Sequence, residues 1–215
     1  MAAGCIKIVH LITGLDTGGA EVSLQRLTGA MDPDRFKNVV VSLTAPGPLS
    51  EAISRQGIKV EAVHMSRSLP SPASFWRLYR LLRAERPDIL QTWLYHSDLV
   101  GLLVGRAARV PAIAWNIRCS HMGDEYRHGV NGALVGALAR FSKYPDAVVA
   151  NSHAGQEEHA ALGYNPKRWE VLTNGFDLAV YKPDADARAS LRQELELPDD
   201  TVLIGLVARY DPMKD

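Results

Sequence analysis

Cysteine is scarce in this sequence, and long apolar runs are missing. The 215 residues include two cysteines, Cys5 and Cys119, which are far apart and outside any C-x-x-C pattern. We therefore expect no disulfide framework and no zinc site, and we interpret both as buried or idle thiols in a reducing compartment. No apolar run approaches the roughly 18 residues that a membrane-spanning helix needs. No apolar leader precedes Cys5. These absences predict a cytoplasmic protein.

An excess of charge of either sign is also missing. Lys and Arg number 24, as do Asp and Glu, so the formal net charge is zero. Because general nucleic-acid binders are strongly basic, we expect no nucleic-acid partner. The D-x-D patterns at 32–34 and 184–186 lie in turns, which favours solvated turns or helix caps over metal ligands. We expect neither a metal ion nor a resident cofactor.

The stretch from residue 6 to residue 31 is the most informative part of the chain. Ile6 to Ile12 is a short β-branched run typical of a buried strand, and helical spacing follows from Ala20 to Met31. The glycine-rich loop at 13–19 joins the two. A strand, a glycine-rich loop and a helix in this order form the phosphate-binding corner of doubly wound folds. The glycines are not spaced as in a dinucleotide or NTPase motif. A tight turn without a ligand is the alternative.

Predicted strands alternate with predicted helices along most of the chain. Further strands are expected at 36–43, 59–64, 89–93, 112–117, 147–150 and 169–172, and helices at 49–56, 75–85, 97–108, 133–141, 152–162 and 187–195. This alternation predicts an α/β fold with a mostly parallel, Rossmann-like sheet and helices on both faces. Ligands of such sheets bind beyond the carboxyl ends of the strands.

The character of the sequence changes after residue 177. We expect a Rossmann-like domain at 1–177, a linker and helix at 178–200, and the first strand of a second domain at 201–215, where Val202–Val207 is apolar and β-branched. A core strand belongs at the start of a domain, so we expect the chain to be truncated.

Several motifs occur in the order typical of one enzyme family. They are Gly18–Glu21, Pro87–Thr92, Asp146–Ser152, Val171–Asp177, and Gly205–Arg209 followed by Lys214. Together they resemble the amino-terminal half of family 4 retaining glycosyltransferases of the two-domain GT-B type. The resemblance implies transfer of a sugar, with retention, from a nucleotide-diphosphate donor to a glycan or polyprenol-linked acceptor. It also implies that a chain lacking most of the donor-binding domain is inactive alone.

The resemblance assigns roles to particular residues. Gly18 and Gly19 would bring backbone N–H groups near the donor, and Arg209 and Lys214 would neutralise the diphosphate leaving group. Many relatives carry a histidine at the end of the fifth strand. Here Arg118 stands in that place and His121 follows three residues later, so these two are our candidate catalytic residues.

Other polar and aromatic residues stand beyond the predicted strands. Asn116 lies in the same candidate stretch as Arg118, and we expect it to contact the substrate. Trp93 and His96 flank the loop after the fourth strand, where a tryptophan face would suit a sugar or a lipid acceptor. The alternative is that Trp93 belongs to the core and His96 to a helix cap.

The helix expected at 75–85 carries a separate signal. Helical spacing buries Phe75, Leu78, Tyr79 and Leu82 on one stripe. It places Trp76, Arg80 and Arg83 on the outer face, which is typical of helices that dock on anionic membrane surfaces. The alternative is a helix with solvated arginines and a covered Trp76.

Two other functional classes stay open at this stage. One is a GT-B enzyme that is not a transferase, such as a nucleotide-sugar epimerase or a phosphorylase. The other is a non-catalytic half-protein that binds glycan.

Overall fold

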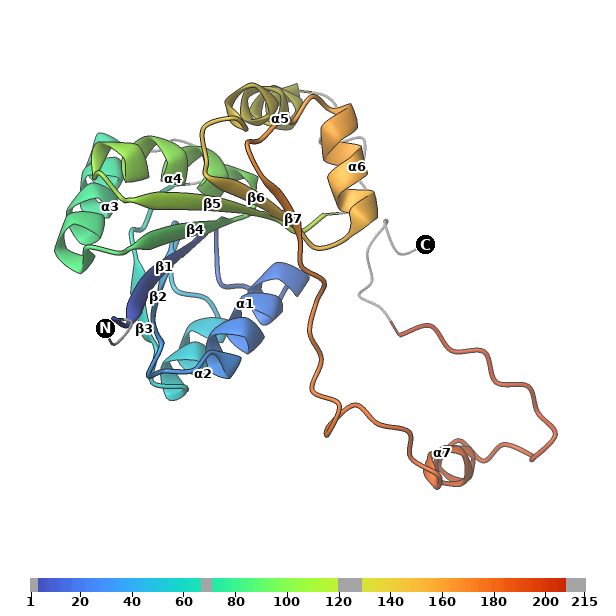
Figure 1. Ribbon diagram of the computed structural model, residues 1–215. Coiled ribbons are helices and arrows are strands. Elements are labelled where there is room, and N and C mark those ends of the chain that lie inside the picture. Colours follow the sequence, from blue (N-terminus) through green and yellow to red (C-terminus); the bar gives the residue numbers. More distant parts are fainter. Residues whose placement is uncertain (1–3, 67–70, 120–128, 208–215) are drawn as a thin grey trace. The chain divides into compact units, whose positions relative to one another are not determined.

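A computed structural model describes residues 4–66, 71–119 and 129–207, and a parallel sheet lies at its centre (Figure 1). The sheet has seven strands in the order β3-β2-β1-β4-β5-β6-β7. Every pair of neighbouring strands is parallel. The strands are β1 (Ile6–Ile12), β2 (Phe36–Ser42), β3 (Lys59–Ala62), β4 (Ile89–Trp93), β5 (Ala112–Ile117), β6 (Ala147–Ala150) and β7 (Trp169–Val171).

Helices cover both faces of this sheet (Figure 1). The helices α1 (Gly19–Ala30) and α2 (Leu49–Arg55) lie on one face. The helices α3 (Pro72–Glu85), α4 (Tyr95–Ala107) and α5 (Gly129–Phe141) lie on the other, and α6 (His153–Ala161) packs beside β6 and β7. The predicted α/β, Rossmann-like architecture is confirmed, with element ends shifted by a few residues.

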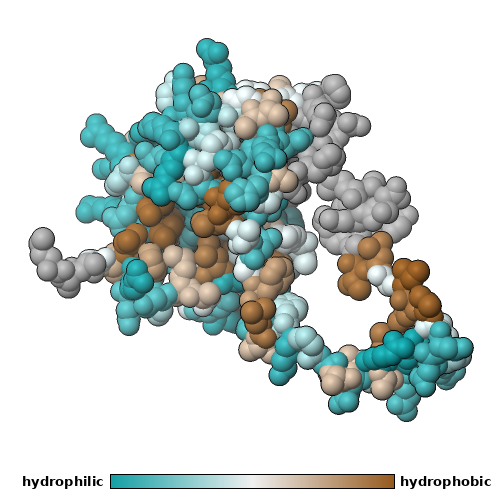
Figure 2. All heavy atoms as spheres, turned by 45° about the vertical axis from the view of Figure 1, so that its right-hand side comes forward, coloured by the Kyte–Doolittle hydropathy of each residue, from teal (hydrophilic) through white to brown (hydrophobic). Residues whose placement is uncertain are grey.

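Contacts divide the chain into two compact units, residues 1–175 and residues 176–215. The second unit contains α7 (Ala187–Glu194), whose buried Arg192 donates hydrogen bonds to the carbonyl oxygens of Pro198 and Thr201. The strand predicted at 202–207 is absent: these residues form no ladder, and most of their apolar side chains are exposed. Figure 2 shows the resulting hydrophobic surface on this segment. Apolar β-branched residues favour a strand only where a neighbouring strand can pair with them.

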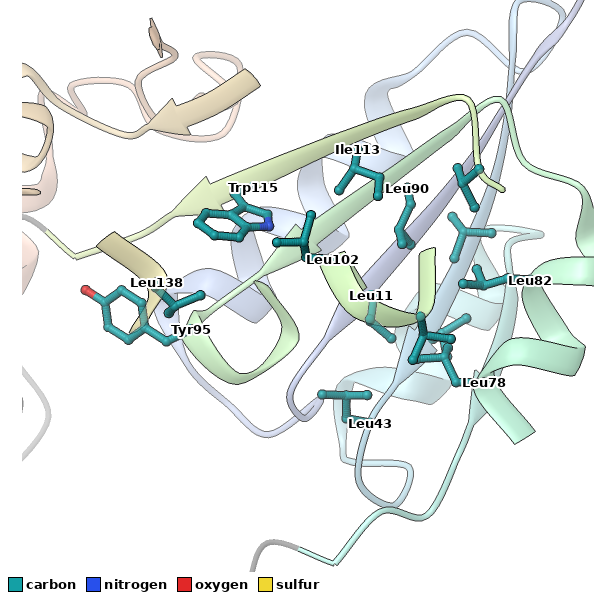
Figure 3. Close-up of a cluster of buried hydrophobic side chains, with 14 of the residues drawn as sticks. Leu11, Leu43, Leu78, Leu82, Leu90, Tyr95, Leu102, Ile113, Trp115 and Leu138 are labelled. Atoms are coloured by element: carbon teal, nitrogen blue, oxygen red, sulfur yellow. The ribbon is translucent and has the colours of Figure 1, made fainter. Parts of the chain in front are cut away.

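The core of the first unit has one layer on each face of the sheet. Under α3, α4 and α5 lie Leu11, Leu78, Leu90, Ile113 and Trp115, among others (Figure 3). Under α1 and α2 lie Ile12, Leu15, Leu24, Val40, Ile53 and Trp93. Because both faces of a parallel sheet are buried, its strands are continuously apolar rather than alternating.

Two glycines let α4 lie directly on the sheet. A Cβ at Gly101 would come within 2.3 Å of Thr92 Cγ2, and one at Gly105 within 2.7 Å of Leu90 Cδ2. The close approach carries the start of α4 to the carboxyl ends of β4 and β5. This geometry positions the polar residues described next.

Candidate functional site

The carboxyl ends of β1 and β4 form the switch point of the sheet. β1 pairs with β2 on one side and with β4 on the other, so the chain winds away from β1 in both directions. The loops after the two central strands therefore diverge, and ligands of open α/β sheets bind where such loops diverge. At this place the hydroxyl of Thr13, after β1, lies 3.1 Å from that of Ser97 in α4.

The start of α1 is open for backbone contacts with a ligand. Its N-cap residue, Gly18, offers no side-chain cap, and a Cβ at Gly19 would meet no heavy atom within 4 Å. The N–H groups at a helix start and the helix dipole favour an anion there. The Glu21 carboxylate lies over Gly18, where an added Cβ would be 2.3 Å from its Oε2. Gly19 is therefore the more accessible of the two predicted glycines.

Arg118 joins three elements at the same edge. It follows β5, and its Nη2 donates a hydrogen bond to Oδ1 of Asn174, which follows β7. Ser23 of α1 donates to the same oxygen over 3.4 Å, and Arg118 Nη1 lies 3.5 Å from Oδ1 of Asn116. Desolvation lowers the pKa of Arg118, yet a guanidinium stays charged at neutral pH. The arrangement holds a half-buried cation near the start of α1.

Asn174 is the member of this group whose role the sequence did not reveal. It stands in a turn-forming Asn-Gly pair, which we interpreted only as a sharp turn. Its contact partners lie 56 and 151 residues away, so no local pattern could have shown them.

Trp93 does not present its face to a ligand, contrary to one of the two sequence readings. Its side chain is 1% exposed and belongs to the core layer under α1 and α2. The guanidinium carbon of Arg118 lies 5.3 Å from the centroid of the Trp93 ring. The indole ring therefore packs against the Arg118 guanidinium. The structure agrees with the alternative interpretation, in which Trp93 is a core residue.

The turn after β4 is strained. Leu94 has φ 73° and ψ 151°, a conformation that is otherwise almost restricted to glycine. The turn leaves the predicted site residue His96 exposed and directs Tyr95, Ser97 and Asp98 inward. Strained backbone that surrounding structure maintains is typical of functional edges of a fold.

A buried polar group lies beneath this turn. Thr92 Oγ1 donates to Oδ1 of Asp98 over 2.5 Å, and burial raises the pKa of Asp98 well above its usual range. Burial and the Asp98 charge also raise the pKa of Tyr164. Asp98 Oδ2, Tyr164 Oη and Trp115 Nε1 are buried and have no hydrogen-bond partner among the residues that the structure describes. Because an ionised carboxylate there would lack half of its partners, the neutral acid is the form that the fold favours.

The remaining predictions of site residues meet the structure as follows. His121, Arg209 and Lys214 lie outside the described residues. In both D-x-D turns the first carboxylate accepts a hydrogen bond from the backbone N–H two residues later, at 2.9 Å in 32–34 and 3.0 Å in 184–186. They are Asx turns, as expected. Among the described residues no group of three His, Cys, Asp or Glu side chains is placed to hold a metal ion.

A hollow of about 500 Å³ lies at the opposite edge of the sheet. Its lining includes Lys7, Lys37 and Lys59, at the amino ends of β1, β2 and β3, together with Glu85. Glu85 pairs with Lys7 at 2.5 Å and with Lys59 at 2.8 Å. Both ion pairs share the one carboxylate of Glu85, which offsets one of the three lysine charges. The hollow is separate from the candidate site.

Helix α3 presents the outer face that its spacing predicts. Leu78 and Leu82 are buried, whereas Arg80 and Arg83 are exposed and the Trp76 side chain is 61% exposed. The Trp76 ring stacks on that of Tyr79 with centroids 5.2 Å apart. In the described part of the chain, no helix combines the length and apolar character needed to cross a bilayer.

Known proteins share this fold and sequence pattern. A Bacillus subtilis protein described as a candidate glycosyltransferase, EpsF, is 23% identical over 218 residues, covering 97% of this chain and 55% of its own. The crystal structure of Anabaena Alr3699/HepE in complex with UDP matches with a TM-score of 0.72 and 23% identity, covering 89% of this chain and 50% of that one. The same protein with UDP-glucose matches with a TM-score of 0.71 and 20% identity over the same shares.

A further solved structure, a glycosyltransferase from Rickettsia africae, matches with a TM-score of 0.64 at 10% identity over 91% of this chain and 51% of that one. The chain thus spans about half the length of the relatives that it matches. The family model for Glycosyltransferase Family 4 matches residues 17–180, which include the start of α1, Arg118 and Asn174. This chain therefore belongs to Glycosyltransferase Family 4.

Proposed function

We propose that the protein takes part in transferring a sugar from a nucleotide-diphosphate donor, with retention, to a glycan or lipid-linked acceptor. The observation that carries the proposal is the convergence of the α1 start, Arg118 and Asn174 at the switch point of the sheet. The proposal assigns no metal ion or cofactor to this site.

The charge of Arg118 suits the chemistry of such a donor. When the bond between sugar and diphosphate breaks, negative charge develops on the leaving group. A cation already fixed by Asn174 and the Trp93 ring stabilises that charge without reorganising during the reaction. The open N–H groups near Gly19 act on the same charge.

The nucleotide in this proposal is a uridine diphosphate. Solved neighbours bind UDP and UDP-glucose. We extend that ligand class to this chain because family membership favours transfer over epimerase, phosphorylase or purely glycan-binding roles. The acceptor is proposed to reach the site from the side of α3, whose exposed Trp76, Arg80 and Arg83 suit an anionic lipid surface.

Titration of the 215-residue chain with UDP, followed by two-dimensional ¹H–¹⁵N NMR, tests the donor site. NMR detects weak binding, which we expect because the chain spans half of its relatives' length. UDP should shift the amide signals of Gly18, Gly19, Arg118 and Asn174, and Arg118→Ala should remove most of these shifts. The matched control is Arg55→Ala, because Arg55 lies on α2 in a surface ion pair with Glu51.

Absence of any shift at millimolar UDP would contradict the proposal, as would shifts confined to the hollow around Lys7 and Lys37. Incubation with radiolabelled UDP-glucose and analysis of the product's anomeric configuration test the transfer and its stereochemistry. A product with inverted configuration would reject retention.

A further inference from the structure

A row of side chains crosses the sheet beneath the candidate site. Asn38 stands on β2, His10 on β1, Trp93 on β4 and Arg118 just after β5, which are neighbouring strands (Figure 1). The register pairs Ile12 with Trp93 and Trp93 with Asn116. Because side chains alternate along a strand, all four members of the row lie on the face that α1 and α2 cover.

Hydrogen bonding determines the tautomer of His10. The indole Nε1 of Trp93 can only donate, and it lies 3.4 Å from His10 Nδ1, which must therefore accept. The hydrogen of the neutral ring is then on Nε2, which lies 3.0 Å from Oδ1 of Asn38. His10 is fully buried, so no water competes for either nitrogen.

The same indole supports the cation of the site. The Arg118 guanidinium carbon is 5.3 Å from the centroid of the Trp93 ring. Arg118 Nε is buried and has no hydrogen-bond partner within the described ranges. On that side the guanidinium contacts only the ring face, so the orientation of the ring contributes to its position.

We propose that His10 is a positioning residue: by accepting the Trp93 N–H it orients the indole, and the indole in turn places the Arg118 guanidinium for the anionic donor. The identity of the ligand in this proposal rests on the proposed function. The arrangement of His10, Trp93 and Arg118 does not depend on it. An apolar residue at position 10 would fill the core without the desolvation cost of a histidine, and it would leave the indole N–H buried and unpaired.

Two substitutions of His10 separate orientation from packing. In His10→Gln an amide nitrogen can replace Nε2 and keep the bond to Asn38, but the acceptor for Trp93 is lost. In His10→Asn an amide oxygen can replace Nδ1 and keep the acceptor for Trp93, while the bond to Asn38 is lost. Both replace an aromatic ring by an amide, so each is the packing control of the other.

The direct readout is NMR of the arginine side chains in the 215-residue chain. The Arg118 Nε–Hε signal, assigned by its disappearance in Arg118→Lys, should be displaced by the ring current of Trp93. We expect His10→Gln to shift it and His10→Asn to preserve it. UDP affinity should fall roughly threefold to tenfold in His10→Gln and stay within about twofold of wild type in His10→Asn.

An unchanged Arg118 signal in His10→Gln would overturn the proposal, as would equal changes in both variants. If His10→Gln does not fold, Trp93→Phe tests the same link. It keeps a ring but removes the N–H that His10 accepts, so UDP affinity within about twofold of wild type there overturns the proposal too. If wild type fails to bind UDP while the Arg118 signal responds to His10→Gln, the proposed function fails and the positioning role stands.

Discussion

Arg118 donates a hydrogen bond to the side-chain oxygen of Asn174, and this contact ties the end of β5 to the loop after β7. Both residues lie beyond the carboxyl ends of their strands, and Ser23 at the start of α1 reaches the same oxygen. The contact is therefore the point at which three separate segments of the first unit meet.

Removing the acceptor from this contact should weaken nucleotide binding without unfolding the protein. Asn174→Ala leaves Arg118 free to turn towards solvent, and we expect UDP affinity to fall about threefold to tenfold. Asn174 is exposed, so the free energy of unfolding should change by less than about 0.5 kcal/mol. Ser23→Ala removes only the 3.4 Å contact and should have a smaller effect on UDP binding. Equal losses in the two variants would contradict this view.

His10 should make the fold sensitive to mild acid. Burial lowers the pKa of His10 to about 4, whereas an unfolded histidine titrates near its ordinary value. Its stabilising contribution is therefore complete above about pH 6.5 and is lost as the pH falls towards 4, by roughly 3 kcal/mol. Urea denaturation of wild type and His10→Asn at several pH values measures the effect. The stability difference between them should shrink on acidification, and a pH-independent difference would refute the prediction.

Asp98 should act in the opposite direction. Because burial raises its pKa, the folded state binds a proton more tightly than the unfolded state. Stability is therefore greatest below the unfolded pKa near 4 and falls as the pH rises towards the folded pKa. Asp98→Asn keeps an acceptor for Thr92 and cannot ionise, so it should gain stability relative to wild type as the pH rises. Asp34→Asn, at an exposed turn, is the surface control for the substitution itself.

The close packing of α4 on the sheet should make Gly101 intolerant of a methyl group. The added Cβ in Gly101→Ala would lie 2.3 Å from Thr92 Cγ2, so either the helix or the strand must move. We expect a loss of about 1–3 kcal/mol in the free energy of unfolding. Gly136→Ala on α5 meets no atom within 4 Å and should instead stabilise by up to about 1 kcal/mol through helix propensity. Thermal and urea denaturation compare the two.

The outer face of α3 should bind vesicles that contain anionic lipid. The exposed Trp76 can insert at the interface while Arg80 and Arg83 contact headgroups. Cosedimentation should fall in the Trp76/Arg80/Arg83 triple alanine variant and vanish with purely zwitterionic vesicles. Arg26→Ala with Arg55→Ala, on helices of the opposite face, should retain wild-type binding. Equal binding by the triple variant and wild type would end the idea.

Much of the fold could be predicted because parallel strands and covering helices have local signatures. The β-branched runs in β1, β2 and β6 and the helical spacing in α3 are readable without any tertiary contact. The run at 202–207 has the same local character and forms no strand, because strand formation also depends on a partner. The local sequence pattern thus predicted where helices and strands form better than it predicted which strands pair.

The site was predicted only in part, for a related reason. Loops at the carboxyl ends of the strands and Arg118 followed from topology and family resemblance. The orientation of Trp93 did not, since a tryptophan at a strand end can face either the core or a ligand. Its partner His10 lies 83 residues away, and only the assembled sheet brings the two together.

The strand order also has a consequence for how the chain folds. The backbone N–H of Lys7 at the start of β1 donates to the carboxylate of Asp88, 81 residues later, over 2.8 Å. β1, β2 and β3 are joined by short connections and can pair early. Pairing of β1 with β4 requires closure of a much longer loop and therefore comes later. During biosynthesis the open side of β1 is therefore an unpaired edge until β4 has emerged, and an unpaired edge of this kind exposes the nascent chain to aggregation.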